Sequence, residues 1–275
     1  ALARAVPLNH YVPLLLYPEL IELAYTADDV ERIHSSGKLV AAIGIENGYV
    51  IGQDLALLVQ YHALGARYIT LSHGGHNDIA DSSRQRAELG DVEAEHDGIS
   101  PFGEQVIAEM NRLGIMVDVS HVSKASALDA IRQSRAPVIA SHSNTRALTE
   151  HFRNMDDETM LALRDNGGVM QTTALGEFVK TLTAEQNQAK DELLRNYGLR
   201  RPGDALGLPR EQRDEIVAAL RDIGFPNVSD FIDHVDHAVD LIGIDHVGIS
   251  SDFDGGGGIV DWFDAGETFN VTLEL

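Results

Sequence analysis

The stretch PVIASHS, residues 137–143, joins the pattern of a buried strand to a polar ending. Pro137 begins it, and the next residues are apolar or small, as in a strand that lies inside a protein. His142 then stands between two serines, at the point where the strand should end. The position of this imidazole raises the question of whether other strands of the chain end in the same way.

Short apolar runs of this kind recur along the chain, with helical patterns between them. The runs are continuous rather than alternating, which is typical of strands buried on both faces. They lie at 38–47, 66–73, 115–121, 136–143, 167–175 and 245–255. Helical patterns lie at 52–65, 100–114, 123–134 and 156–166, with a longer polar helical insert at about 177–242. Repeated strand–helix units predict an α/β fold, either a doubly wound sheet or a barrel.

Two local patterns refine this prediction. Ser100 is a typical N-cap residue, with Pro101 at the first helical position and Gly114 just beyond the predicted end of the helix. The run GGGG at 255–258 follows a strand, but no helix opens there and no lysine follows, so we interpret it as a flexible loop rather than a phosphate-binding loop.

Ionisable residues stand at the C-terminal ends of five of the six predicted strands. In an α/β barrel these ends meet at one rim, which carries the active site. A single histidine at a strand end is more often structural, but several imidazoles and carboxylates buried together need compensation. A divalent cation such as Zn²⁺ suits this set of ligands. The five residues are Glu46, His73, His121, His142 and Asp252.

The remaining histidines are weaker candidates for a metal site. His234 and His237 form an H-x-x-H pair on a predicted helix, but no third ligand is near in sequence. His246 begins its strand, so we expect it at the opposite edge of the sheet. His76 lies in the loop at 74–100 and could shape the pocket.

The composition excludes several classes of function. Of the 275 residues, 43 are Asp or Glu and 21 are Lys or Arg, giving a formal charge of −22. Such a surface repels phosphate backbones and anionic lipid, so nucleic acid and membrane surfaces are not expected partners. The absence of cysteine excludes disulfides and thiolate metal sites. No run of about 18 apolar residues predicts a membrane span, and no signal peptide is evident.

Five stretches of the sequence carry a resemblance to a known family. They are GIENG, ARYITLSHGGHNDIADSS, GISPFGEQVIAEMNRLGIMVDVSHVS, APVIASHSNTRALTEHFRNMDD and DHVDHAVDLIGIDHVGISSDFDG. The chain resembles the membrane (renal) dipeptidase family of zinc peptidases over nearly its whole length, 28–273. The resemblance implies a (β/α)₈ TIM-type barrel of the metal-dependent hydrolase kind, as a single domain over 1–275 with the helical insert.

The resemblance also implies a metal centre. By motif, Glu46 corresponds to the carboxylate that bridges two Zn²⁺ ions, and His121 and His142 to the imidazoles that bind one of them. The family's H-x-D pair for the other ion is absent before Glu46. We therefore expect that the first barrel strands and the last helix are missing from this chain, and that the remaining ligands lie in a longer parent protein.

Three further residues match the family's substrate-binding and catalytic positions. His73 corresponds to the imidazole that contacts the scissile carbonyl and stabilises the oxyanion. Arg153 corresponds to the residue that binds the terminal carboxylate of the substrate, and Asp252 to the acid/base that contacts the bridging water. Asp254 is interpreted as a loop residue.

The expected activity is hydrolysis of dipeptides with a free C-terminal carboxylate through a metal-bridging hydroxide. One alternative is an amidohydrolase for another amide, such as a D-amino acid conjugate, an acylated amino acid or a β-lactam. Another is a metal-poor scaffold without catalytic activity, if the H-x-D pair is truly absent. Family resemblance suggests a homodimer and a periplasmic or extracytoplasmic location, with a cytoplasmic one left open.

Overall fold

The computed structural model describes residues 16–253 and 255–275, so Asp254, which the sequence indicates as a loop residue, lies outside the described residues. The chain divides into two compact units, Ala1–Val138 and Ile139–Leu275. Strands in each unit are parallel and alternate with helices, which confirms the predicted α/β class. The closed barrel and the single domain stay predictions. No helix of the described residues is both long and apolar enough to cross a membrane.

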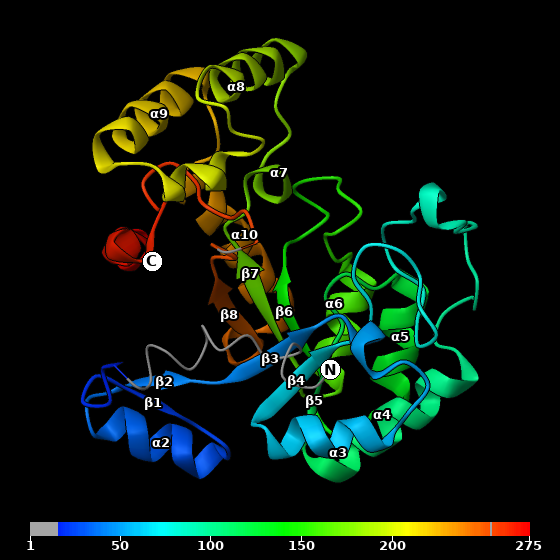
Figure 1. Ribbon diagram of the computed structural model, residues 1–275. Coiled ribbons are helices and arrows are strands. Elements are labelled where there is room, and N and C mark those ends of the chain that lie inside the picture. Colours follow the sequence, from blue (N-terminus) through cyan, green and yellow to red (C-terminus); the bar gives the residue numbers. More distant parts are fainter. Residues whose placement is uncertain (1–15, 254) are drawn as a thin grey trace. The chain divides into compact units, whose positions relative to one another are not determined.

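The first unit contains a parallel sheet in the order β3–β4–β5, with a helix after each strand (Figure 1). Ile45 is in register with Ile69, and Ile69 with Val117, so apolar side chains line up across the sheet. The strands are β3 (Ile43–Glu46), β4 (Ala66–Thr70) and β5 (Met116–Asp118). The helices are α3 (Ala56–Ala63), α4 (Pro101–Leu113) and α5 (Lys124–Gln133), and short 3₁₀ turns lie at η3 (Gly48–Ile51) and η4 (Ala87–Leu89).

The run at 38–47, predicted as one strand, forms two. β2 (Leu39–Ala41) pairs in parallel with β1 (Ile21–Leu23), and α2 (Ala27–Ser35) connects this pair. β3 pairs instead with β4, with a register shift between Ile43 and Gly44. A Cβ on Gly44 would lie 2.0 Å from the ring of Tyr68, so only glycine allows this close approach. Apolar periodicity alone could not locate the change of sheet, because both strands are short and apolar.

Helix α4 begins and ends as the sequence predicts. The Ser100 hydroxyl accepts a hydrogen bond from Gly103 N–H, Pro101 occupies the first helical position, and Gly114 adopts a left-handed φ of 77°. The buried face of α4 includes Val106, Ile107 and Met110. This helix follows the loop at 74–100, so its fixed start anchors one end of that loop.

The second unit contains a parallel sheet in the order β6–β7–β8. Its strands are β6 (Ile139–Ser143), β7 (Val169–Thr173) and β8 (Val247–Ser250), and its helices include α6 (Asp157–Asp165), α10 (Val228–Ile242) and α11 (Thr268–Glu274). Short 3₁₀ turns lie at η6 (Ile244–His246) and η7 (Ala265–Glu267). Hydrogen bonds between the Asn144 side chain and the main chain of Thr173 join the loop after β6 to β7.

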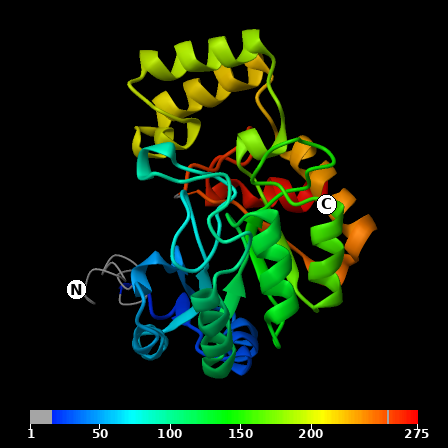
Figure 2. The ribbon, with the colours of Figure 1, turned by 90° about the vertical axis from the view of Figure 1, so that its right-hand side faces the viewer.

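The segment at 177–242, predicted as helical, does not behave as one insert. Its last helix, α10, packs against β7, β8, α6 and α11 of the same unit. α8 and α9 run side by side as a separate pair, which Figure 2 shows clearly. The other elements are α7 (Gly176–Val179), α8 (Ala184–Asn196), η5 (Pro202–Gly207) and α9 (Arg210–Ile223). Seven of the 15 residues of α10 are buried, whereas α8 buries one residue and α9 two, so α10 is the core helix of this segment.

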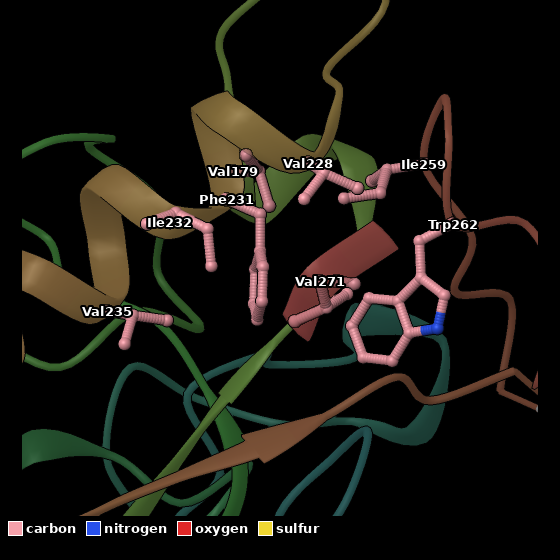
Figure 3. Packing of buried hydrophobic residues seen from close by; sticks show 9 residues of the cluster. Val179, Val228, Phe231, Ile232, Val235, Ile259, Trp262 and Val271 are labelled. Carbon is pink, nitrogen blue, oxygen red and sulfur yellow. The ribbon is translucent and has the colours of Figure 1, made fainter. Parts of the chain in front are cut away.

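Aromatic packing closes the core of the second unit. Phe231 of α10 lies 5.6 Å from Trp262, measured between ring centroids, with aliphatic side chains around both rings (Figure 3). Phe253 packs edge-on against the same tryptophan at 5.6 Å. Such pairs contribute about 0.5–1.5 kcal/mol beyond the burial of apolar area. Because Phe253 follows Asp252 directly, this packing anchors the chain next to a predicted site residue.

Candidate functional site

One carboxylate and two imidazoles lie together in the first unit. Glu46 is the last residue of β3, whereas His73 and His121 follow the ends of β4 and β5 in loops. Glu46 Oε1 lies 2.9 Å from His121 Nε2 and 3.6 Å from His73 Nε2. The two imidazole rings are 4.0 Å apart between centroids. Three of the five predicted strand-end residues are therefore brought together.

The backbone around this cluster is in an unfavourable conformation at two positions. Asn47 and His121 have φ values of 90° and 69°, a region that residues with a side chain seldom adopt. The Asn47 side-chain oxygen accepts hydrogen bonds from Tyr49 N–H and from the side-chain amide of Asn77. Such strain, held in place by surrounding contacts, is typical of functional sites.

A buried acid next to the cluster was not predicted from the sequence. Asp118, the last residue of β5, is fully buried. Its Oδ2 accepts a 2.5 Å hydrogen bond from the Thr70 hydroxyl, and its Oδ1 one of 3.0 Å from Ser120 N–H. Asp118 thereby joins the ends of β4 and β5, just before the two histidines. The signal was present in the sequence, because a carboxylate inside an apolar run needs a partner.

Asp252 lies in a tight glycine loop of the second unit. Its φ is 53°, and its carbonyl oxygen accepts hydrogen bonds from Gly255 N–H at 3.0 Å and from Gly257 N–H at 2.7 Å. Gly258 N–H donates to Ala174 O at 2.9 Å. These three amides therefore donate to carbonyl oxygens of the protein and are not free to bind a phosphate. The loop is also more constrained than the flexible loop expected from GGGG.

His142 and Arg153 are neighbours in the second unit. His142 lies on β6, with its Nδ1 2.8 Å from the hydroxyl of Ser141. Arg153 donates from Nη2 to the His142 carbonyl oxygen at 3.2 Å, and its guanidinium stacks over the Phe178 ring at 5.3 Å. Only 6% of Arg153 is exposed, so any ligand must approach a guanidinium that is already held by the protein.

His234, the better buried half of the H-x-x-H pair, has both ring nitrogens engaged. Thr145 N–H donates to Nδ1 at 3.3 Å, and Nε2 lies 2.8 Å from Val179 O. The ring is therefore a neutral tautomer that donates from Nε2. Burial lowers the pKa of His234 below its ordinary value, which agrees with this neutral form. His234 is a structural residue and not a metal ligand.

His76 and His246 also make structural contacts. The His76 side chain is buried, with Nδ1 accepting from Ser82 N–H at 2.9 Å and Nε2 2.9 Å from Val92 O. His246 precedes β8, and its Nδ1 lies 2.7 Å from Gly168 O. His76 thus holds the loop at 74–100 from inside, and both of its ring nitrogens are already engaged by the protein.

The donor atoms of the first unit suit a divalent cation. Glu46 offers a carboxylate oxygen and His121 an imidazole nitrogen at a mutual distance of 2.9 Å. Carboxylate and neutral imidazole are the donor types that Zn²⁺ and similar borderline metals accept. The chemistry of these residues therefore fits the metal that the sequence resemblance implies.

Comparison with known proteins identifies the family. The model of the membrane dipeptidase family, peptidase family M19, matches residues 10–275. The chain belongs to the membrane dipeptidase family. This agrees with the resemblance seen in the sequence motifs and with a cluster of carboxylate and imidazole groups at strand ends.

Several membrane dipeptidase relatives are similar over most of this chain. The dipeptidase tcpJ of Claviceps purpurea is 35% identical over 240 residues, covering 87% of this chain and 46% of its own length. An uncharacterized dipeptidase of Schizosaccharomyces pombe is 35% identical over 231 residues, covering 83% of this chain and 45% of its own length. The chain therefore spans about half the length of the curated relatives it matches.

A solved structure has a similar fold. The probable dipeptidase PvdM from Pseudomonas aeruginosa is 33% identical, with a TM-score of 0.80. The match covers 96% of this chain and 71% of that protein. The α/β architecture of this chain is therefore that of the membrane dipeptidase family.

Proposed function

We propose that this protein is a metal-dependent dipeptidase that cleaves dipeptides with a free C-terminal carboxylate. The observation that carries the proposal is the Glu46 carboxylate, which lies within 3.6 Å of both His73 and His121. Membership of the membrane dipeptidase family supports the same reaction class. The two curated relatives described above are themselves named dipeptidases.

The proposed metal ligands are Glu46, His121 and His142, each of which offers one ligand atom. The expected metal is Zn²⁺, and by the family resemblance Glu46 would be the carboxylate that two such ions share. A bound divalent cation supplies a water molecule whose pKa is lowered toward neutrality. The carboxylate of Glu46 and the imidazole of His121 then have one task, which is to hold the cation at a fixed place beside His73.

The proposed roles of the other residues follow from their chemical groups. His73 donates a hydrogen bond to the oxygen of the scissile carbonyl as negative charge develops there, which stabilises the transition state by roughly 3 kcal/mol. Asp252 accepts the proton of the attacking water and delivers it to the leaving amine. Arg153 pairs with the terminal carboxylate of the substrate, a task that suits a planar guanidinium.

The decisive experiment is removal and return of metal on the full-length protein. Treatment with EDTA is expected to abolish dipeptide hydrolysis, and added Zn²⁺ to restore it. Hydrolysis that persists at full rate after verified metal removal would contradict the proposal.

A panel of substrates tests the carboxylate requirement. We expect free dipeptides to be cleaved far faster than the same dipeptides with an amidated C-terminus, because only the free form can pair with Arg153. Faster cleavage of acylated amino acids, D-amino acid conjugates or β-lactams would instead favour an amidohydrolase with another amide substrate.

A further inference from the structure

Ser82 lies between the main chains of His73 and His121. It is completely buried in the loop that separates β4 from α4. Its hydroxyl donates to the His73 carbonyl oxygen, and the His121 carbonyl oxygen lies 3.3 Å from the same hydroxyl. The hydroxyl oxygen also accepts a hydrogen bond from Arg84 N–H at 3.1 Å. One small side chain therefore contacts both histidine backbones.

The place of Ser82 is itself fixed by buried polar groups. Its N–H donates to His76 Nδ1 at 2.9 Å, so the imidazole of His76 holds the Ser82 backbone. The neighbouring carboxylate, Asp81, is 1% exposed. It accepts main-chain hydrogen bonds at 3.0–3.2 Å from Glu95, His96 and Gly98. Hydrogen bonds within the loop at 74–100 therefore hold both Ser82 and Asp81 in place.

The strands alone do not determine where the two histidines lie. β4 ends at Thr70 and β5 at Asp118, so His73 and His121 both stand beyond the regular hydrogen bonding of the sheet. His121 also has a φ of 69°, a conformation that needs support from its surroundings. A residue whose hydroxyl donates to one of these main chains and contacts the other is therefore in a position to set the 4.0 Å spacing of the two rings.

We propose that Ser82 is a positioning residue, which fixes the separation of His73 and His121 through their carbonyl oxygens. The inference rests on the proposed function, in which His121 binds metal and His73 stabilises the oxyanion. Loss of the Ser82 hydroxyl is expected to weaken metal binding through His121 and to lower turnover through His73. Substrate recognition by Arg153 should be unaffected, because the Ser82 hydroxyl bonds only to His73, His121 and Arg84 main-chain groups and Arg153 to the His142 carbonyl oxygen.

The test compares Ser82→Ala with a matched neighbour in the full-length protein. Ser83 has a buried hydroxyl without a hydrogen-bond partner among the described residues, so Ser83→Ala removes the same atom but no such contact. We expect S82A to raise the Kd for Zn²⁺ roughly tenfold, measured by competition with a chromophoric chelator. At saturating Zn²⁺, kcat should fall while KM for a dipeptide changes little. S83A should match the unaltered protein in both measurements.

A second control separates positioning from general loss of stability. Thr26→Ala removes the N-cap of α2 in the same unit, which lowers stability without touching either histidine or the loop at 74–100. T26A should therefore show a lower Tm with an unchanged Kd for Zn²⁺. Should S82A fail to fold, Ser82→Cys carries the test, since a thiol is only slightly larger than the hydroxyl but donates weakly. S82C is expected to raise the Kd in the same direction.

The outcomes distinguish this inference from the proposed function. Wild-type Zn²⁺ affinity and wild-type kcat in S82A or S82C would overturn the positioning role alone. An equal rise in Kd for S82A and T26A would also overturn it, because the change in Kd would then follow the loss of stability. Absence of Zn²⁺ binding by the unaltered protein would overturn the metal-dependent function, and the positioning role with it.

Discussion

Asp252 shows at the scale of one residue how packing can hold a proposed catalytic residue in an unfavourable backbone conformation. Its backbone is left-handed, with a φ of 53°, and two glycine amides bind its carbonyl oxygen. The next residue, Phe253, packs edge-on against Trp262. These contacts offset the conformational strain, which for a residue with a side chain is about 1–3 kcal/mol. The carboxylate is thereby kept on a rigid segment.

The variant Asp252→Asn should separate chemistry from metal binding. The amide side chain is nearly isosteric with the carboxylate but cannot accept the proton of the attacking water. We expect kcat to fall on the order of 10²- to 10⁴-fold, with the metal content unchanged by atomic emission analysis. Asp236→Asn, an exposed acid on α10, is the matched control and should retain activity. Loss of metal in D252N would show instead that Asp252 is a ligand.

At the scale of elements, the glycine run at 255–258 is a structural loop. A Cβ on Gly257 would lie 1.8 Å from the carbonyl oxygen of Ser251, a distance that no side chain can tolerate. The Arg201 guanidinium, at the start of η5, donates to Gly255 O, so this short helical turn also holds the loop. The lack of side chains here permits close backbone packing rather than flexibility.

The close packing of this loop predicts that one added methyl group lowers turnover strongly. Gly257→Ala should displace the backbone that carries Asp252, and misplacement of about 1 Å can lower turnover on the order of 10²-fold. Gly207→Ala serves as the control, because nothing lies within 4 Å of a Cβ at Gly207. We expect kcat to fall in G257A and to remain unchanged in G207A. Equal activity of the two variants would show that the loop does not position Asp252.

At the scale of the whole molecule, a buried histidine links stability to pH. His234 joins α10 to the loop after β6 and to the end of α7, through Thr145 and Val179. Burial lowers its pKa in the folded protein from the ordinary value of 6.5. The unfolded chain therefore binds a proton at pH values where the folded protein does not. The free energy of unfolding should fall as the pH drops below about 6.5 and approaches the folded pKa.

Thermal unfolding of a variant measures this contribution. His234→Gln keeps an amide group at the site but does not titrate. We expect H234Q to have a lower Tm than the unaltered protein at neutral pH. The glutamine amide fits the hydrogen-bond partners of His234, Thr145 N–H and Val179 O, less well than the imidazole ring does. The difference in Tm should narrow as the pH is lowered from about 7 to 5. A constant difference across this range would show that His234 does not carry the pH dependence.

Local sequence patterns were sufficient to predict the α/β class, the caps of α4 and the position of Glu46 at the end of its strand. Each of these features depends on a short stretch of chain, namely an apolar run, a capping residue or the polar residue that follows a strand. The division of 38–47 into two strands was not predictable, because it depends on the fit of Gly44 against Tyr68. The packing of α10 against α6 and β7 was likewise not predictable, since α8 and α9 separate these elements from α10 in the chain.

The way in which the candidate site is held became evident only from the folded molecule. Glu46, His73 and His121 come from three strand ends, and their spacing depends on loops that have no regular pattern. The contacts of Ser82 and Thr70 leave no trace in the sequence, because their partners lie up to 48 positions away. Hydrogen bonds between such distant groups form only after the sheet has assembled, so local sequence preferences cannot specify them.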